Sequence, residues 1–523
     1  MLGRPNASLI RSCALSVAAV LSGCAGTGST PAPTLPLTPA AAREIAPQTR
    51  QLIDRITWGM NDSAVQALQA HGRQWYLEQQ LHPSSDLLPE AVQAQMAALS
   101  ADSRPLVQRI AELDQLRRAS AAMGDEQQKK ASRAAYQQQL NRLARNAAAR
   151  SVLRDLYSPN QLQQQMTWFW LNHFSIYQGK DNLRALVGDY EDNAIRPHAL
   201  GKFRDLLTAV VQHPAMLRYL DNDRNAAGHL NENFARELME LHTLGVAGGY
   251  SQQDVQELAR MLTGVGINFS EQTPAVRPAL QDQYVRRDGF EFNPNRHDYG
   301  PKQFLGKPVS ARGLGELEQA IDRLCRSPAT ARFVSRKIAL FLVGEDPAPA
   351  LVERMASAFR ASDGDIAAVL KTLFASPEFM QSLGRSFKDP MHYVLASVRL
   401  AYDNQPIANP APVLQWLNRL GEPLYGRLTP DGYPLAGSAW NGSGQMITRF
   451  EIARDIGAGN AGLFKPESLQ QPTGDPFPRL STAAFPVSLQ DGLSQATRSA
   501  LKQAASPKEW NALLLSSPEL MYR

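Results

Sequence analysis

The amino-acid sequence predicts a mainly α-helical protein: a multi-helix globular body with long irregular loops and one small hairpin. Apolar residues recur at helical spacing along most of the 523 residues, whereas alternating strand patterns are scarce. The composition, 43% hydrophobic and 20% charged, is that of an ordinary globular protein. The segment 269–308 is rich in Asn, Asp, Gly and Pro, so it is the expected place for irregular loops and the hairpin.

The first 23 residues have the pattern of a lipoprotein signal peptide. Two arginines form a positive start, and residues 13–21 form a short apolar stretch. Leu21-Ser22-Gly23-Cys24 follows, in which small residues precede the cysteine that would carry the lipid. The alternative is an ordinary signal peptide with a chance cysteine. We expect a lipid on Cys24 to anchor the chain to a membrane of the cell envelope, and Ala25 favours the outer membrane, facing the periplasm or the exterior.

The rest of the chain divides by composition. Residues 24–48 are rich in Pro, Thr and Ala, cannot bury a core, and are expected to be a tether. Residues 49–523 are expected to form the folded body. Within this body we distinguish a helical arm (104–157), a central helical region (158–380) and a C-terminal helical region (381–523).

Charge and cysteine content exclude several classes of function. A net charge of +5, without basic runs interleaved with aromatics, gives no reason to expect a nucleic-acid partner. Cys13 lies in the signal peptide and Cys24 would carry lipid, so Cys325 is left alone. We therefore expect neither an internal disulfide nor a cysteine-based metal site in the body.

The helices are expected in the following order. Amphipathic patterns predict helices at 49–68 and 74–81, and Ala/Gln/Arg-rich patterns predict a helical hairpin of 106–119 and 126–157 that breaks at 123–125. Ser158-Pro159 is typical of an N-cap followed by a first-turn proline, so a helix carrying His173 should begin there. Further helices are predicted at 203–212, 231–244, 251–262, 315–324, 329–342, 348–361, 366–374 and 391–402.

The densest polar segment is Asn231–His242. At 100° per residue, Asn233, Glu237 and Glu240 fall on one helix face, with Arg236 beside them. Two carboxylates one turn apart could ligate a hard cation or act as acid and base. They could equally belong to a salt ladder of i,i+4 pairs through Arg236. The sequence leaves both interpretations open.

Two further segments carry histidines. His173 shares a helical stripe with apolar residues, where a histidine is more often a core residue than a ligand. His297 and Asp298 lie in a polar loop, where functional residues concentrate, although Asp298 could simply bond its own backbone in a turn. Ser251–Asp254 has the pattern of a capping box, so Asp254 is expected to be structural.

Several motifs along the chain together form a familiar pattern. They are Arg55–Met60, Trp75–Leu81, Trp170–Phe174, Asn231–Gly245, Tyr250–Val255, Ala259–Gly264, His297–Asp298, Phe304–Gly306 and Lys388–Pro390. With these motifs the chain resembles one bacterial family, the "domain of unknown function 1800" family, from about residue 50 to the end of the chain. The resemblance implies a large, mostly helical, exported protein, often encoded beside another exported family similar to the sulfatase and alkaline-phosphatase superfamily. It implies no activity, cofactor or substrate.

Two functions therefore remain as hypotheses. The first is an envelope enzyme, hydrolytic in type, with a polar cleft whose catalytic candidates are His173, Glu237, Glu240 and His297. The second is a non-catalytic partner or assembly factor for another exported protein, such as a sulfatase-like one. Convergence of these side chains in a cavity would favour the enzyme, and an internally paired network would favour the partner. Further binding candidates are Asn172, Asn231, Asn233, Arg236, His242, Arg260 and Asp298.

Overall fold

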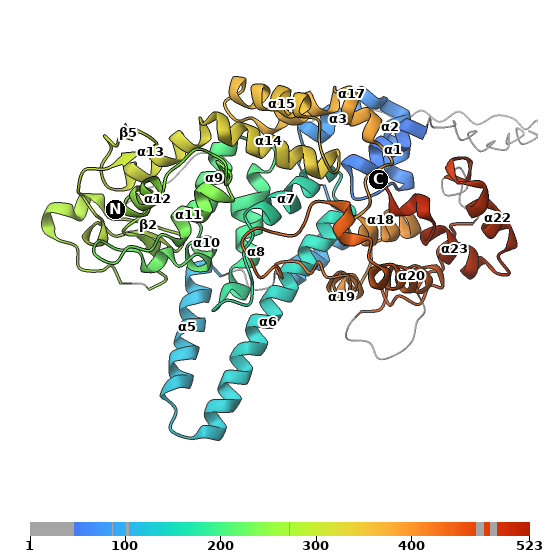
Figure 1. Ribbon diagram of the computed structural model, residues 1–523. Coiled ribbons are helices and arrows are strands. Elements are labelled where there is room, and N and C mark those ends of the chain that lie inside the picture. Colours follow the sequence, from blue (N-terminus) through green and yellow to red (C-terminus); the bar gives the residue numbers. More distant parts are fainter. Residues whose placement is uncertain (1–46, 86, 101–103, 271, 467–474, 482–488) are drawn as a thin grey trace, which may run out of the picture. The chain divides into compact units, whose positions relative to one another are not determined.

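The computed structural model describes residues 47–85, 87–100, 104–270, 272–466, 475–481 and 489–523 (Figure 1). The predicted signal peptide, Cys24 and the tether up to residue 46 lie outside the described residues. The expected mainly α fold is confirmed, because helices dominate and the strands are few and short. No helix among the described residues is both long and apolar enough to cross a bilayer.

The N-terminal helices are shorter than the sequence pattern predicts. In place of one helix over 49–68, α1 (Pro47–Ile56) and α2 (Asp62–His71) are separated by a break. Gly59 in this break has a φ of +120°, and a Cβ there would lie 2.5 Å from Ala396. Only glycine allows this close approach. Asn61 then caps α2 by accepting a hydrogen bond from the Ala64 amide. Helices α3 (Arg73–Leu81) and α4 (Glu90–Leu99) follow.

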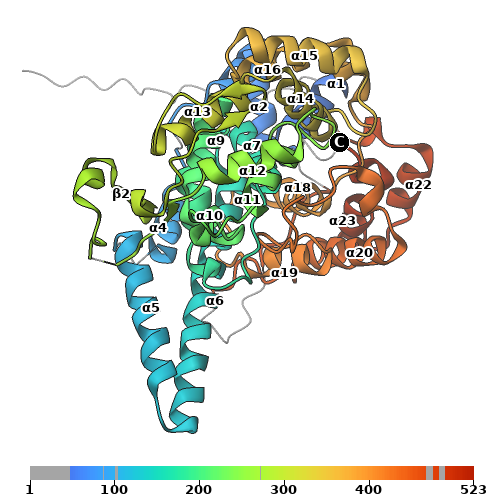
Figure 2. The ribbon, with the colours of Figure 1, turned by 60° about the vertical axis from the view of Figure 1, so that its left-hand side comes forward.

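The predicted helical hairpin is present. Helix α5 (Leu106–Ala122) and helix α6 (Glu126–Tyr157) pack against each other, with the break at residues 123–125 and Asp125 as the N-cap of α6. Their far ends extend away from the other helices in both views (Figures 1 and 2). The expectation for Ser158 was wrong: it is the C-cap of α6, and α7 (Gln161–His173) begins after Asn160.

Helix α7 lies in the centre of the core, because nearly all its side chains are buried, including Met166, Phe169 and Trp170. Helices α14 (Pro328–Leu342), α15 (Pro349–Ala361) and α16 (Ile366–Phe374) pack in succession nearby (Figure 2). The other helices of the central region are α9 (Phe203–Gln212), α10 (Pro214–Tyr219), α11 (Asn233–Glu240), α12 (Gln252–Met261), α13 (Leu314–Cys325) and α17 (Pro377–Ser382).

The irregular segment contains the expected small β structure. Strands β1 (Val265–Ile267), β3 (Phe290–Phe292) and β2 (Val285–Arg287) form an antiparallel sheet in that order. Asp288 and Gly289, both with positive φ, make the tight turn between β2 and β3. A second hairpin pairs β4 (Gln303–Phe304) with β5 (Lys307–Pro308).

The C-terminal helices are tied to the body by buried polar groups. Asp389 caps α18 (Pro390–Tyr402), and its carboxylate lies 2.7 Å from Nδ1 of His392. Arg523 donates to the Phe341 carbonyl at 2.8 Å, and its own carbonyl accepts from the guanidinium of Arg55. These contacts connect segments distant in sequence through the core. The remaining helices are α19 (Ala411–Arg419), α20 (Ser443–Gly457), α22 (Gln495–Gln503) and α23 (Pro507–Leu515).

Candidate functional site

Two buried histidines lie together where α7 ends. The Nε2–H of His173 donates to the carbonyl oxygen of His242 at 3.0 Å, while its Nδ1 has no hydrogen-bond partner among the described residues. His242 is fully buried, and neither of its ring nitrogens has such a partner in this part of the chain. Burial lowers the pKa of His242 to about 3 and that of His173 well below its usual value. Both rings are therefore neutral near pH 7.

His242 reaches this position because its helix ends early. The sequence pattern predicted a helix to residue 244, whereas α11 ends at Glu240. The amides of His242 and Leu244 bond to carbonyls five residues back, those of Glu237 and Met239. This wider turn brings the His242 side chain into the core.

A cavity of about 320 Å³ lies beside His173. Lys337, from α14, lines this cavity and has no hydrogen bond or ion pair within the described part of the chain. Its Nζ lies 5.4 Å from the centre of the Phe333 ring. Burial lowers the pKa of Lys337 to about 8, although Asp431 acts in the opposite direction. An appreciable fraction of this amine is therefore neutral near pH 7.5.

Residues of the loop 427–436 line the same cavity. Asn172 holds this loop, because its amide donates to the Tyr433 carbonyl at 3.0 Å and accepts from the Tyr433 amide at 2.5 Å. A Cβ on Gly432, whose φ is +79°, would lie 2.2 Å from the Asn172 carbonyl oxygen, so only glycine fits there. Arg427 pairs with Asp431 at 3.0 Å, and hydrogen bonds from Thr429 and Arg427 help to keep the pKa of Asp431 low despite burial.

The carboxylates of α11 border this region. Glu237 and Glu240 are half-buried. Burial raises the pKa of Glu237, and the charges of Glu240 and Asp431 raise it further, whereas Arg236 opposes them. Arg236 pairs with Glu232 at 3.1 Å, so one step of the predicted salt ladder is present.

The two asparagines at the start of α11 bind backbone. Asn231 donates to the Asp221 carbonyl at 3.1 Å, and Asn233, which is exposed, donates to the Leu220 carbonyl at 3.3 Å. Both side chains thus hold the start of α11 against the preceding segment 220–221. The described residues contain no group of three or more His, Cys, Asp or Glu side chains placed to hold a metal ion.

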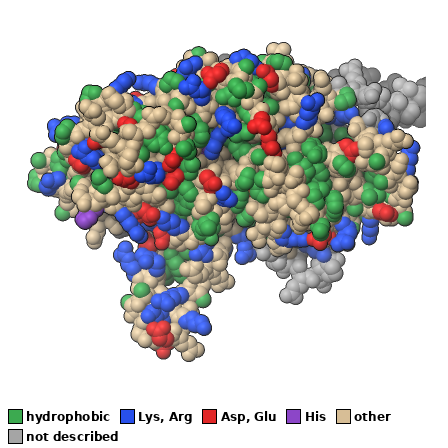
Figure 3. Space-filling model, viewed as in Figure 1, with side chains coloured by type: hydrophobic (Ala, Val, Ile, Leu, Met, Phe, Trp, Pro, Cys, Tyr) green, Lys and Arg blue, Asp and Glu red, His purple; other side chains and the backbone are tan. Residues whose placement is uncertain are grey.

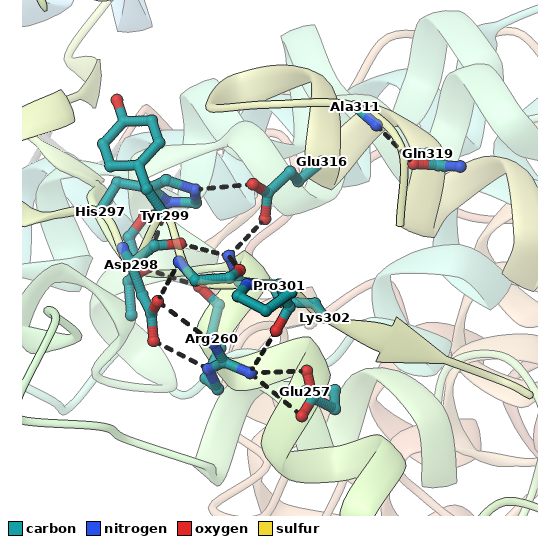
Figure 4. A network of polar contacts seen from close by, with 12 residues as sticks. Glu257, Arg260, His297, Asp298, Tyr299, Pro301, Lys302, Ala311, Glu316 and Gln319 are labelled. Carbon is teal, nitrogen blue, oxygen red and sulfur yellow. Dashed lines mark hydrogen bonds and ion pairs between the residues drawn. The ribbon is translucent and has the colours of Figure 1, made fainter. Parts of the chain in front are cut away.

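The third predicted segment forms a separate network (Figure 4). Arg260 donates to Asp298 at 2.8 and 3.2 Å and also pairs with Glu257. These hydrogen bonds lower the pKa of Asp298 to about 2, so it stays ionised. His297 is buried, and its Nδ1 lies 2.8 Å from the Thr263 carbonyl.

Glu316, from α13, completes this network. One of its oxygens lies 3.2 Å from Nε2 of His297, and the other lies 2.9 Å from Nζ of Lys302. The charged groups in Figure 4 thus lie in ion pairs with one another: Arg260 with Glu257 and Asp298, and Lys302 with Glu316. This pairing connects α12, the 297–302 loop and α13, as expected of a structural network.

The structure therefore brings together two of the three predicted segments. His173 and His242 are in contact, and Glu237 lies near the Asp431 loop that borders the same cavity. His297 shares no hydrogen bond, ion pair or ring contact with them among the described residues. Asp254 forms the predicted capping box with Ser251.

The sequence analysis did not identify two polar side chains of the cavity, Asp431 and Lys337. Asp431 lies in Thr429-Pro430-Asp431-Gly432, a strong turn signature that could have marked its loop. Lys337 follows Arg336 on an ordinary amphipathic helix, and nothing in that pattern distinguishes the two. Its burial depends on Phe333 and on a loop almost a hundred residues later.

Comparison with known proteins identifies the family. No curated protein and no solved structure matches the chain. One family model, described as "Protein of unknown function (DUF1800)", matches residues 51–522, which is nearly the whole chain. The match covers every segment that forms the cavity and the network of Figure 4. The chain therefore belongs to the DUF1800 family.

Proposed function

We propose that this protein is a lipid-anchored enzyme of the cell envelope, with Lys337 as the general base of a hydrolytic reaction. The observation that carries the proposal is an amine with a pKa of about 8, without hydrogen bond or ion pair in the described structure, on the wall of a cavity. A base is most effective when its pKa lies near the working pH. Stability alone gives no reason to retain an unpaired amine at a half-buried position.

The chemistry of the cavity favours a base over a nucleophile. The neutral Lys337 amine can remove a proton from a water molecule that attacks a carbonyl carbon. Direct attack by the amine on an ester would instead leave a stable amide and end the reaction after one turnover. The loop held by Asn172 gives the cavity a fixed wall against which a substrate and its water can be positioned.

Hydrolysis of p-nitrophenyl acetate, a generic activated ester, tests the proposal. We expect turnover beyond one equivalent, with a rate that rises with pH through an apparent pKa near 8. Lys337→Met should lower the rate at least tenfold. Arg336→Met is the matched control, because Arg336 is the exposed neighbour on the same helix, and it should keep the rate.

Three results would count against this function. An unchanged rate in Lys337→Met would exclude Lys337 as the base. A rate governed by a pKa near 10.4 would show an ordinary surface amine at work. A single equivalent of product, with an acetyl group found on Lys337 by mass spectrometry, would show a reactive amine without hydrolytic turnover.

A second candidate function is supported by the network of Figure 4. Arg260, Asp298, His297 and Glu316 are paired with one another or with their neighbours, as expected of a rigid scaffold. The chain would then serve as a non-catalytic partner or assembly factor for another exported protein, such as a sulfatase-like one. Co-purification of such a protein with both the wild type and Lys337→Met, in the absence of any hydrolysis, would favour this function.

We propose the membrane anchor from the lipobox, the segment Leu21-Ser22-Gly23-Cys24. A lipid on Cys24, followed by the Pro/Thr/Ala-rich segment, would hold the folded body at a membrane surface. The residue after the cysteine, Ala25, supports an outer-membrane location facing the periplasm or the exterior.

A further inference from the structure

We propose that the cavity at the base of the α5–α6 hairpin binds a phosphate group, through the guanidinium groups of Arg109, Arg142 and Arg184. This cavity has a volume of about 770 Å³ and is separate from the Lys337 cavity. Its wall comes from the ends of α4 and α5, the second half of α6, and the segment that contains α8 (Val187–Asp189).

Five arginines line this cavity, and their existing partners differ. Arg104 pairs with Glu112, and Arg150 pairs with Asp192 at 3.2 Å. The remaining three have no carboxylate partner among the described residues. They are Arg109, Arg142 and Arg184.

The three arginines without a carboxylate retain donors for a ligand. Arg109 and Arg142 have no hydrogen bond or ion pair within the described ranges, and the buried Nε of Arg109 has no acceptor. Within the described structure Arg184 donates to neutral amide oxygens alone, those of Asn141 and Gln137, and its buried Nε has no acceptor there. These amides orient the guanidinium and leave its charge uncompensated.

The carboxylates of the wall are already engaged. Asp189 accepts from Nε2 of His213 at 3.0 Å. Burial would raise the pKa of Asp192, but the charges of Arg154, Arg196 and Arg150 outweigh this effect and lower it. Asp192 therefore stays ionised and paired, and it does not neutralise the three free arginines.

The α5–α6 hairpin as a whole is positively charged. Residues 104–155 carry eleven Lys and Arg against five Asp and Glu, a net charge of +6, whereas the whole chain has +5. Lys and Arg side chains are visible over this arm in Figure 3. The hairpin that carries the cavity is thus strongly positive, and its field would attract an anion from solution.

Guanidinium geometry selects the ligand class. Its planar fork matches the oxygens of a phosphate or phosphate ester, and several such groups around one cavity are typical of phosphate recognition. The ligand could be a free phosphate compound or the headgroup of an anionic lipid, and both offer the same phosphate oxygens.

Binding measurements on the full chain test this site. Calorimetry with inorganic phosphate and with glycerol 3-phosphate probes the free compounds, and co-sedimentation with phosphatidylglycerol vesicles, against phosphatidylcholine vesicles, probes the headgroup. The variant Arg109→Gln/Arg142→Gln removes two free guanidiniums. The matched control is Lys130→Gln/Arg133→Gln, because it makes the same charge change at exposed positions of α6 outside the cavity.

We expect the cavity variant to lose at least tenfold in affinity and the control to stay within about twofold. Binding of the free phosphates would identify a soluble ligand, and binding of the anionic vesicles alone would identify a lipid headgroup. The proposal is overturned if neither is bound, or if both variants lose vesicle binding equally, because general attraction to the arm would then explain it. Protein stability should be similar in both variants, which urea denaturation checks.

Discussion

Replacing Lys337 by Met should stabilise the protein at pH 7. A pKa of about 8 in place of 10.5 corresponds to roughly 3 kcal/mol of unfavourable free energy for the charged form, at about 1.36 kcal/mol per pH unit. Lys337 keeps part of its surface in solvent, so we expect a gain of about 1–2 kcal/mol. Methionine has a similar unbranched chain and can occupy the same space.

The stabilisation by Lys337→Met should decrease as the pH rises. Below pH 8 the amine is charged in both the folded and the unfolded state, and the folded state bears the cost of burying it. Between pH 8 and 10.5 the unfolded chain binds more protons, so the stability of the wild type rises with pH. The advantage of Lys337→Met should therefore be full at pH 7 and shrink towards pH 10.5, where only a packing difference remains.

Urea denaturation at pH 7, 9 and 10.5 measures this difference. Arg336→Met, at an exposed position of the same helix, should show no such pH dependence. The opposite result is a Lys337→Met variant that is less stable than the wild type by more than about 1 kcal/mol at every pH. Lys337 would then stabilise the fold, and its low pKa could not be read as a sign of function.

Three further predictions concern other parts of the chain. Cys24→Ala should block processing and membrane attachment, so that an uncleaved precursor accumulates; normal processing, seen by mass spectrometry of the product, would contradict the lipobox. Cys325→Ser should cost only about 1 kcal/mol in thermal denaturation, because burial raises the pKa of this thiol to about 12 and it stays an uncharged packing group; a larger loss would point to another role. Arg523→Met should destabilise the protein by about 3 kcal/mol, because the buried guanidinium contacts both the Phe341 carbonyl and His392. Tyr522→Ala, at a side chain that is 42% exposed, should cost much less. Similar losses of stability in the two variants would contradict this role of Arg523.

The long helices could be predicted from the sequence because their signals are local. The break at 123–125 between α5 and α6, and the capping box of Ser251 and Asp254, depend only on residues within a few positions. The split between α1 and α2 could not be predicted, because Gly59 is required by contact with Ala396, more than three hundred residues away. Ser158 failed as an N-cap for a related reason: a Ser-Pro pair fits the end of one helix as well as the start of the next.

The candidate site was predictable only in part, because contacts between distant segments leave no local signal in the sequence. His173 and the 231–242 segment were marked by their residue types, and they do meet. The contact between them depends on the wide turn after Glu240, which the helical pattern does not predict. The lack of an ion pair for Lys337 within the described residues depends on the packing of α14 against the 427–436 loop, which no local sequence pattern predicts.

The contrast between the two polar clusters separates the two proposed functions. In the network of Figure 4 the side chains of Arg260, Asp298 and Glu316 are paired with neighbours, so each contributes to holding the fold. Buried atoms without a hydrogen-bond partner in the described structure occur in both clusters, in the rings of His173 and His242 and also at Nε2 of His297 and one oxygen of Glu316. The clusters differ in their charged groups, because Lys337 has no ion pair among the described residues. Leaving a buried polar group unpaired costs about 1–3 kcal/mol, so stability alone would favour apolar side chains there. Ion pairing within the fold accounts for the charges of the first cluster, whereas a substrate or its water in the cavity would supply the partner that Lys337 lacks in the described structure.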